Sequence, residues 1–301
     1  MMTRRRFLAV SAATAFAGAA RAAAPQVYTW TGIALGARAT IRLAHPDAAA
    51  ITARAAAEID RLEDVFSLYR EGSALMRLNA AGRIETPPPE LLECLTLAGA
   101  VHRATDGLFD PTVQPLWALW AERAAAGGRP TTSELASARA FGGWSDLRLD
   151  SGSVTLNPGM ALTLNGIAQG YIADRIASLL EAEGLTDILI DTGEMRALGG
   201  HPDGGNWPVK LAEGGEVALR ARALATSAPL GTVFDAAGKA GHILHPVTGE
   251  PAAPVWRAIS VSAPSAALAD ALSTAACLMP TKAGIDEAAA RFTSARCEAA
   301  V

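Results

Sequence analysis

The sequence predicts an α+β fold, in which mixed, largely antiparallel sheets are flanked by helices. Segments with the alternating pattern of strands and segments with the 3.6-residue pattern of helices are mixed along the chain, without the strict alternation of a doubly wound sheet. No internal repeat and no low-complexity linker divides the 301 residues. We therefore expect one folded unit with a sizeable core over residues 23–301, after a leader at residues 1–22.

The elements follow one another in a clear order. Residues 27–44 alternate apolar and polar side chains and predict a hairpin or a pair of strands. Residues 47–66 have a helical pattern, with Asp47 as a plausible N-cap. The prolines at 87–89 open a second helix, because proline is tolerated in a first helical turn. The later predictions are two short strands within 147–165, a helix at 170–182, strands at 188–190, 207–211, 216–219 and 258–263, and a helix at 265–278.

The first 22 residues are predicted to be a twin-arginine export signal. Residues 3–8 read Thr-Arg-Arg-Arg-Phe-Leu, an apolar run of small residues follows, and Ala20-Arg21-Ala22 resembles a cleavage site. A buried N-terminal helix is excluded because the run has no amphipathic period. We therefore expect a periplasmic protein. Neither the run nor any later apolar segment is long enough to cross a membrane.

Charge and cysteine content argue against two kinds of site. Without the four arginines of the leader, 22 basic residues face 30 acidic ones, which gives a net charge of −8. An acidic chain with no basic run is not expected to bind nucleic acid. Cys94, Cys277 and Cys297 have no partner at metal-binding spacing, which argues against zinc, and they allow at most one disulfide. Cys94 and Cys277 lie in apolar segments typical of the core.

A turn bounded by two glycines precedes the helix predicted at 170–182. Gly166 and Gly170 carry no Cβ, so the backbone can approach a ligand closely. The helix directs free N–H groups and the positive end of its dipole toward the turn, which suits a phosphate or a diphosphate. The spacing matches neither G-x-G-x-x-G nor a P-loop. A tight strand-to-helix connection without a ligand remains the alternative.

Asp270 and Thr274 form a second candidate site, in the helix predicted at 265–278. Residues four apart share one helix face, and nearly all neighbours are apolar, so an unpaired carboxylate would be costly to bury there. A hard cation would take the carboxylate, the hydroxyl and backbone carbonyl oxygens as ligands. The alternative is a hydrogen-bonded Asp270, with Thr274 bonding back to its own helix.

Two further residues are candidates for ligand contact. Asp110, held extended by the proline that follows, could accept hydrogen bonds from a ligand, although an Asp-Pro turn ahead of a helix also explains it. Tyr69 lies where the chain changes direction and could stack on a planar ligand. A surface tyrosine is the alternative.

Two segments that lie close together in the sequence offer groups that could bind an anion and accept a proton beside it. Thr226 and Ser227 offer adjacent hydroxyls and backbone amides. His242 and His245 are three residues apart beside a turn. They permit a two-histidine metal site, a single proton acceptor beside a phosphate, or ordinary hydrogen-bonded histidines.

In their order along the chain, these segments resemble the ApbE family of FAD:protein FMN transferases over nearly all of the mature length. Seven motifs in family order are far more specific than a single glycine turn. They lie at residues 35–41, 67–79, 107–116, 166–174, 225–227, 242–249 and 260–274. The resemblance implies an ApbE-like fold and a reaction at the diphosphate of FAD.

In the implied reaction, a threonine or serine hydroxyl of an acceptor protein attacks the phosphorus on the FMN side of FAD. AMP leaves, and FMN remains linked to the acceptor through a phosphoester. Mg²⁺ neutralises the diphosphate and stabilises charge on the leaving oxygen. Two alternatives are an FAD-binding carrier that presents flavin without transfer, and an FAD pyrophosphatase in which water replaces the acceptor hydroxyl.

The resemblance also implies roles for individual residues. Asp270, Thr274 and the carbonyl oxygen of Ala168 would hold the ion, and His242 would accept the hydroxyl proton. Tyr69 would cover the isoalloxazine ring. The remaining positions implied to contact FAD are Ser73, Asn79, Asp110, Thr112, Gln169, Glu194, Thr226 and Ser227.

Several residues depart from the family pattern. Gln169 stands where most members have lysine, which removes a positive charge near the expected diphosphate and makes the carrier alternative possible. His245 replaces the usual aspartate, and residues 227–229 read Ser-Ala-Pro. Together with residues 191–194, these variants resemble the NosX subgroup, which accompanies nitrous oxide reductase. The implied acceptor is then a flavoprotein like the membrane protein NosR.

Overall fold

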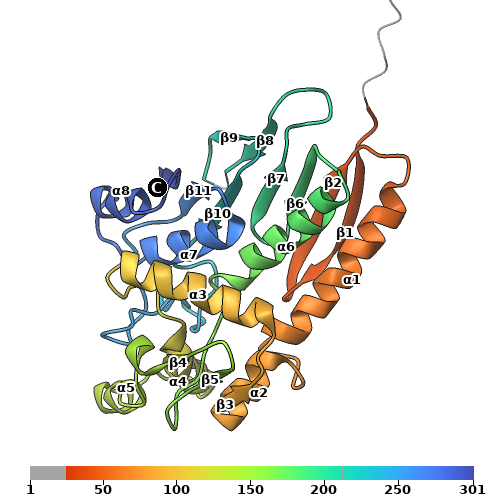
Figure 1. Ribbon diagram of the computed structural model, residues 1–301. Coiled ribbons are helices and arrows are strands. Elements are labelled where there is room, and N and C mark those ends of the chain that lie inside the picture. The colour runs from red at the N-terminus through yellow and green to blue at the C-terminus, as the bar shows by residue number, and fades with distance from the viewer. Residues whose placement is uncertain (1–24, 212) are drawn as a thin grey trace, which may run out of the picture.

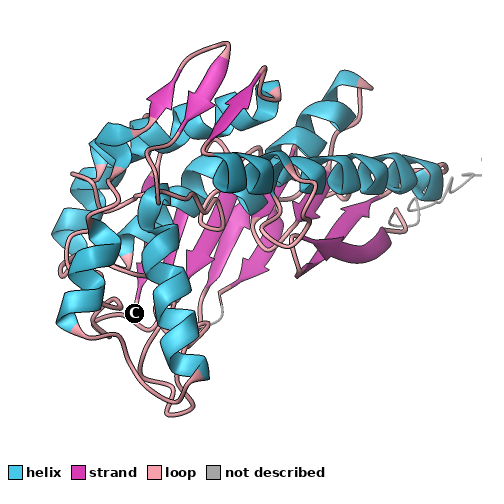
Figure 2. Ribbon diagram, turned by 90° about the horizontal axis from the view of Figure 1, so that it is seen from below, coloured by secondary structure: helices cyan, strands magenta, loops and turns pink. Residues whose placement is uncertain are grey.

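A seven-stranded antiparallel sheet forms the centre of the molecule, with the strand order β1-β2-β6-β7-β10-β11-β12. Helices cover one face of this sheet (Figures 1 and 2). The structure is a computed structural model that describes residues 25–211 and 213–301. The α+β prediction is therefore confirmed, whereas the predicted leader at residues 1–22 lies outside the described residues.

The elements have the following bounds. The large sheet comprises β1 (Tyr28–Ala34), β2 (Ala37–Leu43), β6 (Ile188–Asp191), β7 (Met195–Leu198), β10 (Ala223–Ser227), β11 (Ile259–Ala263) and β12 (Arg296–Ala300). Two small sheets comprise β3 (Arg83–Glu85), β4 (Arg148–Leu149) and β5 (Ser153–Thr155), and β8 (Trp207–Lys210) and β9 (Glu216–Leu219). The helices are α1 (Ala48–Phe66), α2 (Ala74–Ala81), α3 (Pro89–Ala104), α4 (Gln114–Ala125), α5 (Thr132–Arg139), α6 (Ala168–Ala182), α7 (Ala266–Ala276) and α8 (Lys282–Ala290), with short 3₁₀ turns η1 (Pro111–Val113) and η2 (Trp144–Asp146).

The long periodic elements were predicted correctly. The hairpin β1–β2 and the helices α1 and α3 lie where the patterns place them, and β9 has the predicted bounds. Helix α6 begins two residues earlier than expected, and α7 ends at Ala276 rather than at 278. Cys94 and Cys277 are buried core residues, and all three cysteines are free thiols.

The two faces of the sheet belong to different cores, as the two-residue period of a strand requires. Ile188 and Ile190 of β6 point to the main core, against which α1, α6 and α7 pack, whereas Leu189 between them points to the opposite face. There the β8–β9 hairpin covers the sheet with Trp207, which is fully buried. Helix α3 lies over α7 (Figure 1). Among the described residues, no helix combines the length and apolarity needed to cross a membrane.

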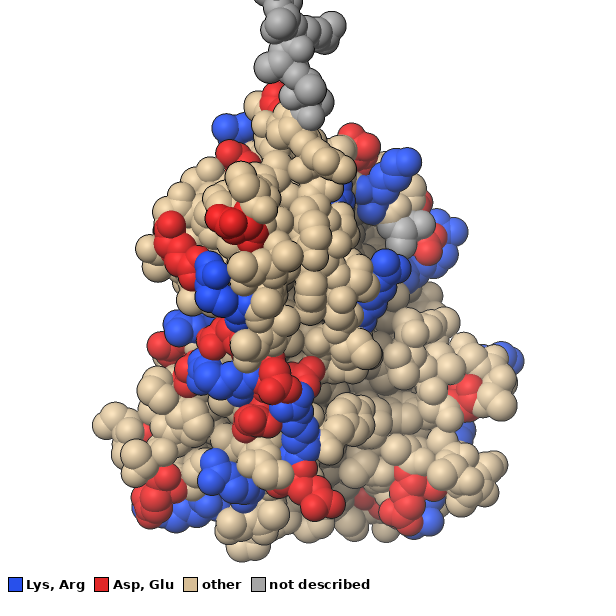
Figure 3. Space-filling view, turned by 90° about the vertical axis from the view of Figure 1, so that its right-hand side faces the viewer, with Lys and Arg blue, Asp and Glu red and all other residues tan. Residues whose placement is uncertain are grey.

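Ion pairs connect the surface helices to one another. Arg61 of α1 pairs with Glu90 of α3 at 2.6 Å, and Arg54 of α1 pairs with Glu183 at the end of α6. Figure 3 shows basic and acidic side chains interspersed over the face that carries α1 and β1. Such exposed pairs contribute about 0–1 kcal/mol each, so they orient the helices more than they stabilise the fold.

The first turn of α6 packs directly on α7. A Cβ added at Gly170 would lie 2.3 Å from the carbonyl oxygen of Ala266, so any larger residue would separate the two helices. We expect Gly170→Ala to lower the free energy of unfolding by about 3 kcal/mol or more, because backbone atoms cannot move aside as a flexible side chain can. Gly72 is the matched control, since it has open space and an ordinary backbone conformation. Urea unfolding should place Gly72→Ala within about 1 kcal/mol of the parent chain; equal stability of the two variants would contradict this packing.

Candidate active site

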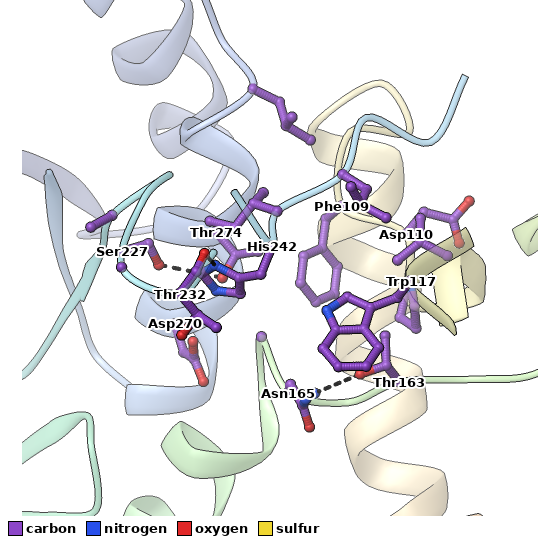
Figure 4. Close-up of a pocket in the computed structure, with 18 of the residues that line it drawn as sticks. Phe109, Asp110, Trp117, Thr163, Asn165, Ser227, Thr232, His242, Asp270 and Thr274 are labelled. Carbon is purple, nitrogen blue, oxygen red and sulfur yellow. Dashed lines mark hydrogen bonds between the residues drawn. The ribbon is translucent and has the colours of Figure 1, made fainter. Parts of the chain in front are cut away.

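A cavity of about 340 Å³ opens where η1, the turn before α6, the end of β10 and α7 meet. Its two walls differ in chemistry (Figure 4). Leu108, Phe109 and Val113 with Trp117 of α4 form an apolar wall. Carboxylate, hydroxyl and amide groups form the other: Asn165, Gln169, Glu194, Thr226, Ser227, Asp270 and Thr274. Thr163 lies beside Trp117. The cavity is large enough for part of a dinucleotide, which combines flat rings with a charged diphosphate.

Asp270 is a buried carboxylate with few partners. Its side chain is 3% exposed, and its Oδ2 accepts one hydrogen bond, from the N–H of Gly170 at 3.3 Å. Burial raises the pKa of Asp270 to about 8; the Gly170 bond opposes this shift and the charge of Asp174 adds to it. Asp174 itself is better satisfied, because it accepts bonds from Ala266 and Ala267 at 2.8 and 2.9 Å. Asp270 is therefore the carboxylate for which a bound cation would offset the cost of burial.

Hydroxyl groups surround Asp270 on the same side of the cavity. Thr274 lies one helical turn further along α7, as its spacing predicts. The Ser227 hydroxyl of β10 lies 3.4 Å from that of Thr274 and 2.7 Å from that of Ser273. Gly166 lets the turn before α6 approach this group, because a Cβ there would lie 3.0 Å from Thr274 Oγ1. Hydroxyl groups of β10 and α7 thus meet beside the turn before α6.

Glu194 and Gln169 complete the polar wall. Glu194 is 8% exposed and accepts a hydrogen bond from the Thr226 N–H at 3.2 Å. Burial raises the pKa of Glu194 well above its usual range, and the charge of Asp270 raises it further. Gln169 packs against Gly193, where an added Cβ would lie 2.7 Å from its Nε2. No lysine or arginine lines this cavity in the described structure, so a bound diphosphate would need another source of positive charge.

His242 lines the cavity from the loop after β10. Its Nδ1 lies 3.0 Å from the carbonyl oxygen of Thr232, an acceptor, so Nδ1 carries the proton and Nε2 is free to take one. Burial lowers the pKa of His242, although the Thr232 bond opposes this. The ring is therefore neutral at neutral pH and suited to accepting a proton.

The structure does not bring the two histidines together. His245 lies in a separate groove beside Pro251, where its Nδ1 accepts a hydrogen bond from the Val247 N–H at 3.1 Å. Across residues 25–211 and 213–301, no three His, Cys, Asp or Glu side chains have metal-binding geometry. The described arrangement therefore favours a single histidine over a two-histidine metal site.

Asp110 lines the cavity, but its carboxylate is engaged by its own turn. Oδ1 accepts hydrogen bonds from the Thr112 N–H at 2.8 Å and from the Thr112 hydroxyl at 2.6 Å. Thr112 is buried and does not line the cavity. Ala168, the expected carbonyl ligand, is also buried in the first turn of α6 and is not a lining residue. The backbone of Gly166, two residues earlier, is the part of the turn beside Thr274.

Tyr69 and Ser73, in the 67–79 motif, lie outside the cavity. Tyr69 is 78% exposed. Ser73 is buried at the start of α2, where its hydroxyl accepts a hydrogen bond from the Met76 N–H at 3.0 Å and donates one to the Ser67 carbonyl at 2.6 Å. This is a helix cap, and its contacts hold the chain between α1 and α2.

Asn79 does not line the cavity but holds Leu162, the residue before the lining residue Thr163. Its side-chain amide donates to the carbonyl oxygen of Leu162 at 2.9 Å and accepts from the Leu162 N–H at 2.8 Å. We expect Asn79→Ala to lower the free energy of unfolding by about 2 kcal/mol, because both backbone groups of Leu162 lose their partner. The exposed Asn206 is the control, and Asn206→Ala should stay within about 0.5 kcal/mol in urea unfolding. If Asn79→Ala leaves the free energy of unfolding unchanged, the two hydrogen bonds between Asn79 and Leu162 do not hold this segment in place.

Sequence reasoning missed Trp117, Thr163 and Thr232, which line the cavity together with Asn165, the residue just before the glycine turn. No helix was predicted over residues 114–125, so no sequence pattern assigned Trp117 or Trp120 to the core or to a site. In the structure Trp120 of α4 is buried, at 1% exposed, whereas Trp117 is half-buried at the cavity.

Comparisons with known proteins agree with this geometry. The ApbE family matches residues 35–298. An FAD:protein FMN transferase of Haemophilus influenzae is 30% identical over 237 residues, which cover 71% of this chain and 68% of that protein. One from Klebsiella pneumoniae is 28% identical over 246 residues, 75% of this chain and 70% of that protein. The apo flavinyl transferase ApbE of Pseudomonas stutzeri has a TM-score of 0.79 at 27% identity, over 90% of each chain. Since the family match spans nearly all of the folded chain, this protein is a member of the ApbE family.

Proposed function

We propose that the protein is an FAD:protein FMN transferase that acts in this cavity. The observation that carries the proposal is the pairing of Asp270, Thr274 and Ser227 on one wall with an apolar wall opposite. The first wall suits the diphosphate of FAD and the second suits its rings. Two similar proteins in other bacteria carry the same activity in their names.

The residues present fit a divalent cation, which we propose to be Mg²⁺. Asp270 is buried with one weak hydrogen bond, and no lysine or arginine lines the cavity to neutralise a diphosphate. Asp270 and Thr274 would hold the ion together with a carbonyl oxygen of the turn before α6. When bound, the ion would neutralise the diphosphate and stabilise charge on the leaving AMP.

The transfer requires a proton acceptor and an exact position for the phosphorus. The acceptor hydroxyl oxygen forms a bond to the phosphorus on the FMN side, the bond from that phosphorus to the AMP oxygen breaks, and the hydroxyl proton goes to Nε2 of His242. The Ser227 hydroxyl, which ends β10 at the cavity, would orient the phosphate oxygens, while the Thr226 N–H holds the Glu194 carboxylate in the same wall. Because the pKa of His242 is lowered, protonation of its ring should reduce transfer only at acidic pH when Mg²⁺ is saturating.

We further propose that the protein is exported to the periplasm and flavinylates a membrane flavoprotein of the NosR kind. The twin-arginine pattern of residues 3–8 supports export, and the folded unit would be residues 23–301. Gln169 and His245, where most of the family differs, support the NosX subgroup and thus a role in nitrous oxide reductase maturation.

One incubation separates the proposed activity from its alternatives. The purified mature chain is mixed with FAD, Mg²⁺ and an acceptor domain, and intact masses and free nucleotides are measured. Transfer predicts an acceptor that gains one esterified FMN group, with release of AMP. Free FMN and AMP without a modified acceptor would identify a pyrophosphatase. Intact bound FAD with no product would identify a flavin carrier.

A further inference from the structure

We propose that Trp117 is a stacking platform for one planar ring of FAD, a role that rests on the proposed function. Trp117 projects from α4 into the apolar wall, across the cavity from Asp270 and Thr274 (Figure 4). A dinucleotide whose diphosphate lies at the polar wall must place a ring elsewhere in the cavity. Flat heterocycles stack on indole, which has the largest π-surface of any side chain.

The other aromatic side chains fit this role less well. Phe109 also lines the cavity, but it is 5% exposed, so core residues already cover its ring. Tyr69 is exposed and does not line the cavity in the described structure. Trp117 is half-buried, so one part of its ring is supported and another part remains free for a ligand.

The ring of Trp117 is fixed before any ligand arrives. It packs edge-to-face with the ring of Phe234, with 5.4 Å between ring centroids and an interplanar angle of 63°. Phe234 in turn stacks on Trp120 at 5.8 Å and 23°. Trp120 is fully buried and donates a hydrogen bond from Nε1 to the carbonyl oxygen of Gly249 at 2.8 Å. A preorganised ring loses little conformational freedom on binding, which favours affinity.

Phe234, which packs against Trp117, belongs to the same loop as His242. The Phe234 N–H donates to the carbonyl oxygen of Ala240 at 2.8 Å, and the Asp235 carboxylate accepts from two backbone N–H groups of the same turn. His242 follows two residues after that turn and lines the cavity. A ring that stacks on Trp117 is therefore held in a fixed position relative to the loop that carries His242, the proposed proton acceptor. Trp117 is a positioning residue for the transfer.

The test compares Trp117→Leu, which removes the aromatic ring, with Trp117→Phe, which keeps one. Trp30→Leu is the control, because Trp30 is another half-buried tryptophan that does not line the cavity. Calorimetry with Mg²⁺ measures the dissociation constants of FAD, FMN and AMP, and melting temperatures verify folding. We expect Trp117→Leu to bind FAD about tenfold more weakly and Trp117→Phe to recover most of the affinity. Trp30→Leu should bind as the parent does.

The separate ligands identify the stacked ring. A loss confined to FMN assigns the isoalloxazine, and a loss confined to AMP assigns the adenine. If Trp117→Leu does not fold, the quenching of tryptophan fluorescence by FAD tests the stacking instead. Part of the quenching seen in the parent chain should be absent in Trp117→Phe and retained in Trp30→Leu.

The outcomes separate this inference from the proposed function. Parent-like FAD affinity and quenching in both Trp117 variants would overturn the inference, even if FMN transfer is observed. Weaker FAD binding by Trp117→Leu without any acceptor modification by the parent would support the inference and overturn the transferase. A parent chain that does not bind FAD would overturn both.

Discussion

Asp270→Asn should reduce FMN transfer by about 10³-fold or more, because it removes the carboxylate that we propose holds the cation at the diphosphate. The change is isosteric, and it removes a carboxylate that is costly to bury, so the melting temperature of the cation-free variant should not fall. Transfer is measured from the rate at which the acceptor gains FMN.

Thr274 provides a matched pair of variants for the same site. Thr274→Val keeps the shape of the side chain and removes the hydroxyl, so it should lower transfer strongly, whereas Thr274→Ser should keep most of the rate. Transfer by Asp270→Asn at the parental rate, or equal activity of the two Thr274 variants, would show that the cation is held elsewhere.

The second large effect concerns stability and pH. The pKa of Asp270 is raised to about 8, and the pKa values of Glu194 and Asp174 are also raised, each mainly by burial. Between their unfolded and folded pKa values these groups bind a proton in the folded chain that the unfolded chain has released. The cation-free protein should therefore lose a few kcal/mol of stability as the pH rises from about 5 to about 8.

Mg²⁺ should restore the stability that is lost as the pH rises, because the ion takes the place of the proton on the Asp270 carboxylate. The rise in melting temperature caused by Mg²⁺ should grow with pH over the same window, because the ion binds the ionised carboxylate. Asp270→Asn should remove the effect of Mg²⁺ and reduce the pH slope, leaving the contributions of Glu194 and Asp174. A Mg²⁺ effect that is equal in Asp270→Asn would contradict this linkage.

The long elements could be predicted because the hydrophobic pattern of each is complete within its own residues. Helix α1 buries Ile51, Ala55 and Ile59 along one stripe, and the strands β1 and β2 alternate over seven residues each. Strands such as β7 and β10 escaped prediction. They have four and five residues, and both their pairing and their burial come from neighbours distant in the sequence.

The site was partly predictable for the same reason. Asp270 and Thr274 are visible as a polar pair on an apolar helix, and the glycine turn is visible as a local pattern. Their meeting was implied by the family resemblance and not by either local pattern, because it depends on the packing of α6 against α7 across about 100 residues. Asn79 and Trp117 show that residue type and motif membership do not reveal which residues line the cavity. A polar residue in a motif holds backbone 83 residues away, whereas a helical tryptophan without a polar signal lines the cavity.

The central claim is that one site, built by the turn before α6, the end of β10 and α7, holds the diphosphate of FAD with a divalent cation. Anomalous diffraction from crystals grown with FAD and Mn²⁺ in place of Mg²⁺ tests it most directly. We expect one manganese peak between Asp270 and Thr274, with the diphosphate beside Ser227. Manganese bound away from Asp270, or FAD bound outside the cavity, would contradict the claim.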